Sequence, residues 1–202
     1  MVAGPEKSRR EDAKPHRARK AARRGASPPA RVTPFWTLRT ARLVLTPVNG
    51  ADLPALHALK ADPRVYAIML GGVRNAAETA LDLAHDVAGW GARGYGLWAI
   101  REKADGRFTG LTGLEPRADG RGVALRFALW PEAQGRGRAR EAAGAALRVG
   151  HDPAGLARIV AVARETNFAS RTVLGGIGMA PRETFIQNGH GMILFESARG
   201  AG

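Results

Sequence analysis

Hydrophobic positions recur along the chain with two different periods, which predicts a succession of strands and helices. Short apolar runs or strict alternation, the pattern of β-strands, occupy residues 42–47, 94–101, 108–114, 123–129, 158–163, 184–187 and 192–195. Apolar residues spaced three and four apart, the pattern of amphipathic helices, follow Asp52, Asn75, the loop 131–139 and Asn167. The order β-α-α-β-β-β-α-β-α-β-β predicts a single α/β domain with a mixed sheet.

Polar residues at the ends of these elements sharpen the prediction. Asp52 is the expected N-cap of the first helix, and Asn75 with Glu78 has the spacing of a capping box for the second. The inward face of the second helix is expected to hold Ala80, Leu83, Ala84, Val87 and Trp90. Asn188-Gly189 between two strand patterns predicts a two-residue hairpin turn.

Composition excludes several classes of protein. With 202 residues and 45% hydrophobic side chains, the chain can bury a real core, so it is not disordered throughout. It has no cysteine, which excludes a disulfide scaffold, a thiolate zinc site and a cysteine nucleophile. No run approaches 18 apolar residues, so no membrane span is predicted. The lack of cysteine fits a reducing compartment, and we expect a cytoplasmic protein.

Positive charge is concentrated at the N-terminus. The chain carries a net charge of +13, and residues 1–34 hold ten basic against three acidic side chains, which is seven of the thirteen net charges. This segment has almost no large apolar residue, so we expect a disordered basic tail. Its basic side chains could bind the phosphates of ribosomal or other nucleic acid. The alternative is an upstream extension without a role, since basic runs are often simply solvated.

A strand, a glycine-rich loop and a helix follow one another between Leu129 and Ala143. Gly135 and Gly137 let the backbone approach an anion with no side chain in the way. The first amides of the helix lack internal partners, and the helix dipole adds to their attraction for phosphate. Three arginines stand beside the glycines: Arg136, Arg138 and Arg140. The sequence therefore predicts a phosphate or pyrophosphate site here.

Comparison with known nucleotide-binding patterns narrows the choice of ligand for this loop. The chain has no G-x-x-x-x-G-K-[ST] run, which excludes a Walker A loop, and the dinucleotide fingerprint needs a third glycine where Arg140 stands. Gln134-Gly135-Arg136-Gly137-Arg138-Ala139 fits a third pattern, [QR]-x-x-G-x-[GA]. In this respect the loop resembles that of the GNAT acetyltransferase superfamily, in which it clasps the pyrophosphate of coenzyme A.

Segments on both sides extend the resemblance over about residues 37–197, to the Rim-type branch of ribosomal-protein N-acetyltransferase-like proteins. The matching segments are Thr37–Leu45, Gly94–Ile100, Phe108–Leu114, Trp130-Pro131-Glu132 with the loop and Glu141-Ala142, and Thr166–Ser170 with Gly178-Met179. The resemblance implies a GNAT fold over residues 35–199. This is one α/β domain with a mixed, mostly antiparallel sheet of six to seven strands, flanked by helices.

The resemblance also implies an enzyme that uses acetyl-CoA as co-substrate and no metal. Backbone groups of Leu129 and Trp130 would receive the pantetheine arm, and an amide there would polarise the acetyl carbonyl. The amides from Gln134 to Ala139 would bind the pyrophosphate, with Arg136 either on a phosphate or solvated. Asn167 would contact the pantetheine arm and Ser170 would lie near the leaving sulfur; capping the following helix is the alternative role of both.

The group that would protonate the leaving thiolate is the first point at which the chain departs from the family. The amine must lose a proton, the carbonyl oxygen must be stabilised, and the thiolate must be stabilised or protonated as it leaves. Many relatives place a tyrosine after the second cofactor segment as general acid. The tyrosines here, Tyr66 and Tyr95, both lie upstream. Ser170 or a water molecule is therefore expected in that role.

The general base is the second departure. The position at which relatives often carry a glutamate is Ala124, with Arg126 two residues later. The candidates for the general base are Glu115 at a strand end, Glu132 beside the loop and His190 in the last hairpin. Each is alternatively a solvated side chain, and a neutral α-amine would need no strong base.

Three functions remain open at this stage. The first is acetyl transfer from acetyl-CoA to a primary amine, either of a small molecule or of a protein N-terminus, by direct attack in a ternary complex. The second is a non-catalytic acyl-CoA-binding protein of the GNAT fold. The third is a basic nucleic-acid-binding protein, although no stacking platform or recognition helix is evident. Dimers are common among the relatives, so a homodimer is also expected.

Overall fold

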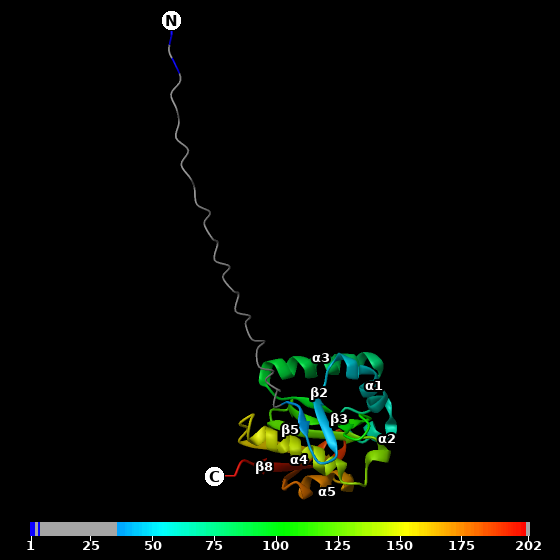
Figure 1. Cartoon of the computed structure of the whole chain (residues 1–202). Coiled ribbons are helices and arrows are strands. Elements are labelled where there is room, and N and C mark those ends of the chain that lie inside the picture. The colour runs from blue at the N-terminus through cyan, green and yellow to red at the C-terminus, as the bar shows by residue number, and fades with distance from the viewer. Residues whose placement is uncertain (3, 5–35, 201–202) are drawn as a thin grey trace. The chain divides into compact units, whose positions relative to one another are not determined.

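The structure is a computed structural model that describes residues 36–200 together with Met1, Val2 and Gly4. The chain divides into two units, Met1–Val32 and Thr33–Gly202, and the second contains all helices and strands of the described residues (Figure 1). The predicted disordered tail, residues 1–34, lies outside the described residues except at Met1, Val2 and Gly4.

A sheet of eight strands forms the centre of the second unit, in the order β1-β2-β3-β4-β5-β6-β8-β7. The strands are β1 (Leu38–Arg39), β2 (Leu43–Pro47), β3 (Leu97–Glu102), β4 (Phe108–Pro116), β5 (Val123–Leu129), β6 (Arg158–Arg164), β7 (Ala180–Gln187) and β8 (His190–Ala198). All neighbours pair antiparallel except β5 and β6. The predicted mixed, mostly antiparallel sheet is confirmed. It has more than seven strands because the chain turns back at Thr40, so residues 37–45 form two strands instead of one.

Helices cover both faces of this sheet, as Figure 1 shows. On one face lie α1 (Leu53–Ala61), α2 (Pro63–Tyr66) and α3 (Ala76–Arg93). On the other lie α4 (Arg138–His151) and α5 (Phe168–Gly176). Two short 3-10 helices, Gly50–Asp52 and Pro131–Ala133, precede α1 and the loop before α4. Among the described residues, no helix is both long and apolar enough to cross a membrane.

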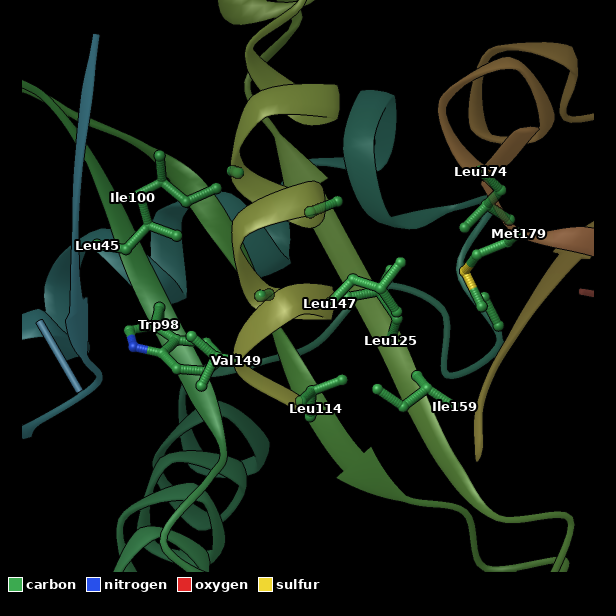
Figure 2. Packing of buried hydrophobic residues seen from close by; sticks show 14 of the residues in the cluster. Leu45, Trp98, Ile100, Leu114, Leu125, Leu147, Val149, Ile159, Leu174 and Met179 are labelled. Carbon is green, nitrogen blue, oxygen red and sulfur yellow. The ribbon is translucent and has the colours of Figure 1, made fainter. Parts of the chain in front are cut away.

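The largest core lies between α4 and the sheet. Ala142, Ala143 and Ala146 are fully buried, and their small side chains allow α4 to lie close to the strands. Figure 2 shows Leu147 and Val149 of α4 among the sheet residues of this core. Labelled sheet residues are Leu45, Trp98, Ile100, Leu114, Leu125 and Ile159. A second core, on the opposite face, joins Leu56, Leu59 and Leu83 to Leu97, Ala99, Leu111 and Ala128. Two packed faces therefore hold β4 and β5 rigidly.

Several local predictions can be compared with these elements. The capping box is confirmed: Asn75 Oδ1 accepts from Glu78 N at 2.9 Å, and Glu78 Oε2 accepts from Asn75 N at 2.8 Å. The Asn188-Gly189 turn is also confirmed, with both residues at positive φ. Asp52 is not a side-chain cap of α1. Its carboxylate instead accepts from Asn49 N at 2.9 Å, closing the 3-10 turn that precedes the helix.

The predicted inner face of α3 is only partly correct. Leu83 and Trp90 are buried, but Ala80, Ala84 and Val87 face solvent. The buried face is completed by Thr79 and Asp86. The buried face of α3 has the same helical spacing as the predicted one but is rotated around the helix axis; it contains Thr79, Leu83, Asp86 and Trp90. The prediction placed the face incorrectly because it considered only hydrophobic residues.

Candidate active site

The two parallel strands at the centre of the sheet separate soon after they meet. β5 and β6 pair only at Val123 with Ile159 and Ala124 with Val160. From Leu125 onward β5 diverges from β6, and a cleft of about 440 Å³ opens between them. We call it the β5–β6 cleft; its walls include Leu125 to Phe127 and Ala161 to Arg164. A sheet that opens in this way exposes strand edges to a ligand.

The cleft is reached from both faces of the sheet. Asn167, Ser170 and Leu174 of α5 line it from the α4 side. The segment Ile68–Gly71, which follows α2, lines it from the opposite side together with Glu115 of β4. Two molecules can therefore meet in it, one from each face.

Backbone groups along β5 face this opening. Trp130 N donates to Thr109 O of the neighbouring strand segment at 3.0 Å, and Trp130 O accepts from Ala133 N at 2.9 Å. Because backbone groups alternate sides along an antiparallel strand, the N–H groups of Phe127 and Leu129 point away from β4. Both backbone groups of Trp130 thus have a partner within the protein, which leaves its carbonyl oxygen, with a second lone pair, as the group that can still receive a ligand. The N–H of Leu129 makes no hydrogen bond with another described residue, while its carbonyl accepts from Gln134 Nε2 at 2.9 Å.

The loop that follows β5 is shaped for an anion. Gly135 and Gly137 have φ of +71° and +75°, and Gly137 is the N-cap of α4 without any side-chain cap. A Cβ added at Gly135 would meet no atom within 4 Å, so open space lies above its backbone. Arg42 fixes the loop, since its Nη1 donates to Arg136 O at 2.8 Å and its Nε pairs with Glu141 at 2.7 Å. The uncapped helix start fits the phosphates of a coenzyme.

The three arginines of the loop region differ in what their side chains can do. Arg138 is paired with Glu102 of β3 and is mostly buried, so only its amide is available. Arg136 and Arg140 are exposed and form no ion pair with any described residue. A second, more open hollow of about 700 Å³ adjoins the loop and is lined by Arg39, Arg42, Arg140 and Arg148. The positive charge around the α4 N-terminus thus extends along the outer side of the helix.

Glu141 holds the first strands against this helix. Its carboxylate accepts from Thr40 Oγ1 at 2.6 Å and from Arg42 N at 2.8 Å. Burial alone would raise the pKa of Glu141, but these hydrogen bonds and the charge of Arg42 outweigh it and lower the pKa. Glu141 is therefore ionised at neutral pH and keeps Arg42 in position under the loop.

The start of α5 brings two predicted residues to the cleft. Asn167 Oδ1 accepts from Ser170 N at 3.0 Å, so Asn167 does cap the helix. Its Nδ2 and the hydroxyl of Ser170 make no hydrogen bond with any described residue, although both residues line the cleft. Capping and ligand contact are thus compatible roles for Asn167, because they use different atoms.

Comparison with known proteins identifies the family to which this cleft and loop belong. The family model of the acetyltransferase (GNAT) domain matches residues 42–180. The chain belongs to the GNAT acetyltransferase family. A relative from Aspergillus fumigatus, FsC-acetyl coenzyme A-N(2)-transacetylase, is 31% identical over 165 residues, which are 74% of this chain and 67% of that protein. The predicted membership is confirmed, and the protein is an N-acetyltransferase.

Solved structures of other acetyltransferases share the fold. An acetyltransferase from Agrobacterium tumefaciens strain C58 has a TM-score of 0.71 and 28% identity, covering 80% of this chain and 93% of its own. The ribosomal-protein-S5-alanine acetyltransferase from Vibrio fischeri has a TM-score of 0.70 over 82% of this chain and 98% of its own, at 15% identity. The Rim-type resemblance of the sequence is therefore matched by a shared fold.

Among the predicted bases of this GNAT enzyme, only Glu115 lines the cleft. It is ion-paired with Arg126 of β5, and both side chains are partly exposed. Glu132 and His190 are exposed and are not part of the cleft wall. Tyr66, on the same side of the sheet, is buried, and burial raises the pKa of its hydroxyl far above neutrality. It stays protonated and cannot act as a base.

Asp86 of α3 is a charged residue of this region that the sequence did not reveal. It is 8% exposed and makes no hydrogen bond or ion pair with the described residues. Burial raises the pKa of Asp86 to about 6, the positive charge of Lys60 opposes the rise, and the negative charge of Glu115 adds to it. The spacing of Leu83, Asp86 and Trp90 at i, i+3 and i+7 was the signal that could have found it.

Proposed function

We propose that the protein transfers the acetyl group of acetyl-CoA to a primary amine by direct attack within a ternary complex. The observation that carries the proposal is the β5–β6 cleft, which opens to both faces of the sheet. The anion-binding loop and α5 lie on one side and the charged group around Glu115 on the other. Donor and acceptor would enter from opposite faces and meet between the strands, which holds them at reacting distance.

The donor side has the groups that an acyl-CoA requires. Amides from Gly135 to Ala139 at the uncapped start of α4 would bind the pyrophosphate, and Arg136 and Arg140 would add positive charge. The N–H groups of Phe127 and Leu129, which point away from β4, and the Nδ2 of Asn167 would hold the pantetheine arm. The hollow beside Arg39 and Arg148 would receive the nucleotide part, whose further phosphate suits its charge.

The chemical step needs few groups from the protein. An α-amine titrates near ~8 and a lysine near ~10.4, so an α-amine reaches its reactive neutral form more readily at pH 7. Glu115 would accept the proton directly or through water as the amine attacks. The N–H of Leu129 would stabilise the carbonyl oxygen as it gains charge, and Ser170 would donate a hydrogen bond to the departing sulfur.

Substitution of Gly135 tests this function with a matched pair of variants. Asn and Asp both tolerate positive φ and have nearly the same size, so Gly135→Asn and Gly135→Asp differ chiefly in charge. We expect Gly135→Asp to weaken acetyl-CoA binding by about 100-fold or more, because a carboxylate would lie beside the pyrophosphate. Gly135→Asn should weaken it far less.

Isothermal titration calorimetry measures the acetyl-CoA affinity of the unmodified protein and of both variants. Turnover with a panel of primary amines then tests for acetyl transfer. Equal melting temperatures of the two variants would show that charge and not misfolding causes the difference. Equal affinities of the two variants, or no binding by the unmodified protein, would contradict the proposed donor site. Binding without acetylation of any amine would favour the non-catalytic alternative.

A further inference from the structure

One positive charge in the β5–β6 cleft has no counter-ion among the residues that the structure describes. Four arginines line the cleft: Arg74, Arg117, Arg126 and Arg164. Arg117 Nε donates to Asp119 at 2.9 Å, Arg126 is paired with Glu115, and Arg74 lies 3.6 Å from Glu78 and 3.8 Å from Asp82. Arg164 forms no ion pair with any described residue.

Arg164 projects toward the acceptor side of the sheet. It is the last residue of β6, in which Ala161 and Ala163 belong to the core beneath α4. Because side chains alternate along a strand, Arg164 lies on the opposite face, next to the segment that follows α2. Its Nη2 makes one long contact of 3.4 Å with Ala67 O. The guanidinium therefore reaches across the mouth of the cleft.

Two buried polar atoms of residues that line the cleft lack a hydrogen-bond partner in the described part of the chain. Arg164 Nε is buried and has no hydrogen-bond partner among the described residues, and the same is true of Oε1 of Gln187, which also lines the cleft. A buried donor or acceptor without a partner costs free energy, more for a charged group, so few proteins retain one without a ligand or water to satisfy it. An unpaired donor and an unpaired acceptor in one cleft indicate a polar ligand.

We propose that the amine acceptor carries a carboxylate, which Arg164 binds while the amine lies toward Leu129 and Ser170. This inference rests on the proposed function and names its substrate class. A guanidinium edge matches a carboxylate with two parallel hydrogen bonds. Gln187 Oε1 would accept from an N–H of the same substrate.

The charge of the cleft favours a carboxylate over a phosphate. Arg74, Arg117 and Arg126 each have a carboxylate partner, which leaves Arg164 as the one uncompensated cation among the described lining residues. A carboxylate supplies one negative charge, whereas a phosphomonoester carries about 1.5 to 2 at pH 7. The carboxylate can belong to a free amino acid-like molecule or to a peptide with an acidic residue near its N-terminus.

Matched acceptor pairs test the proposal on the full-length protein. The small-molecule arm compares ω-amino acids with their carboxamides, which keep the amine and lose the charge. The peptide arm compares tetrapeptide amides that contain Glu with the same peptides containing Gln. We expect kcat/KM to favour the carboxylate member by about 10- to 100-fold, the effect of one charge-assisted pair. The arm that shows the preference identifies the source of the carboxylate.

Variants at Arg164 connect this preference to the residue. Arg164→Gln should remove the preference by lowering kcat/KM for the carboxylate member only, and Arg164→Lys should restore part of it. Arg182→Gln is the matched control, because Arg182 is exposed on β7 and lies outside the cleft wall. It removes the same charge and should leave the preference unchanged.

The outcomes separate this proposal from the proposed function. Acetylation of both members of every pair at equal rates, or a preference that survives Arg164→Gln, would overturn the carboxylate proposal and leave the enzyme function intact. Where turnover is slow, dissociation constants for the same acceptor pairs, measured on the protein with CoA bound, test whether the carboxylate is recognised. If no pair then differs in affinity, the proposal is wrong even if no acceptor is acetylated.

Discussion

Asp86 occupies a position on α3 where a helix of this kind usually buries an apolar side chain. Its carboxyl group packs on the same face as Leu83 and Trp90, and burial raises its pKa to about 6 from an ordinary value of 3.8. Between these two pH values the folded state binds more protons than the unfolded chain. Asp86 therefore lowers the free energy of unfolding as pH rises from about 4 to 6, by about 3 kcal/mol in all.

Replacing Asp86 by Asn, which cannot ionise, should remove this dependence. We expect Asp86→Asn to be more stable than the unmodified protein by up to about 3 kcal/mol at pH 7.5, and about equally stable at pH 4. Urea unfolding at several pH values measures the difference between the two proteins, so other titrating groups cancel. A difference that is the same at pH 4 and pH 7.5 would show that Asp86 does not titrate as described.

Single residues also show how far the sequence could specify the site. Asn167 and the glycines of the loop are recognisable because capping and positive φ are local properties of the chain. Arg164 was not recognised, since what makes it notable is the lack of a partner within a cleft formed by distant segments. The one hydrogen bond that its side chain makes with the described residues is to Ala67, 97 residues away. Asp86 was missed because the apolar stripe of α3 was assigned to the wrong face.

At the scale of elements, the order of strands and helices was largely predictable, whereas the opening between β5 and β6 was not. Both strands have sequences that are typical of β-strands, and their separation depends on how each packs against other strands. The four-residue helix α2 was also missed, because a single turn has too few residues to show a period. The cleft thus arises from non-local packing, while the loop that adjoins it is encoded locally.

The start of α5 allows capping and cofactor binding to be separated. Asp caps a helix about as well as Asn, so Asn167→Asp should keep the bond from Ser170 N and change stability by less than about 0.5 kcal/mol. It removes the Nδ2 donor, and we expect acetyl-CoA affinity to fall by about 3- to 10-fold, the effect of one lost hydrogen bond. Calorimetric titration and thermal unfolding measure the two effects.

Asn167→Ala is the companion variant at this position. It lacks the acceptor as well as the donor and should in addition lose about 1 kcal/mol of stability. Unchanged acetyl-CoA affinity in Asn167→Asp would leave Asn167 with a capping role only.

At the scale of the whole molecule, charge is divided between two parts of the chain. Residues 1–34 account for seven of the thirteen net positive charges, and residues 35–202 for the other six. Among the described residues, those that form the hydrophobic cores all lie within residues 36–200. Acetyl transfer and any binding of nucleic acid would therefore depend on different parts of the chain. A homodimer and a cytoplasmic location stay predictions from the sequence.

Removal of residues 1–34 tests this division. We expect the shortened protein to bind acetyl-CoA within about twofold of the full chain, because the loop and cleft residues all lie beyond position 34. Affinity for RNA at low salt should fall steeply. For the full chain, the logarithm of that affinity should decrease linearly with the logarithm of salt concentration, by about 0.7 to 0.9 per phosphate contacted. A full-length variant with the ten basic residues of the tail changed to Gln separates charge from length. RNA binding that persists in both variants would locate the nucleic-acid contact on the acetyltransferase domain itself, where the exposed arginines around the start of α4 are the first place to examine.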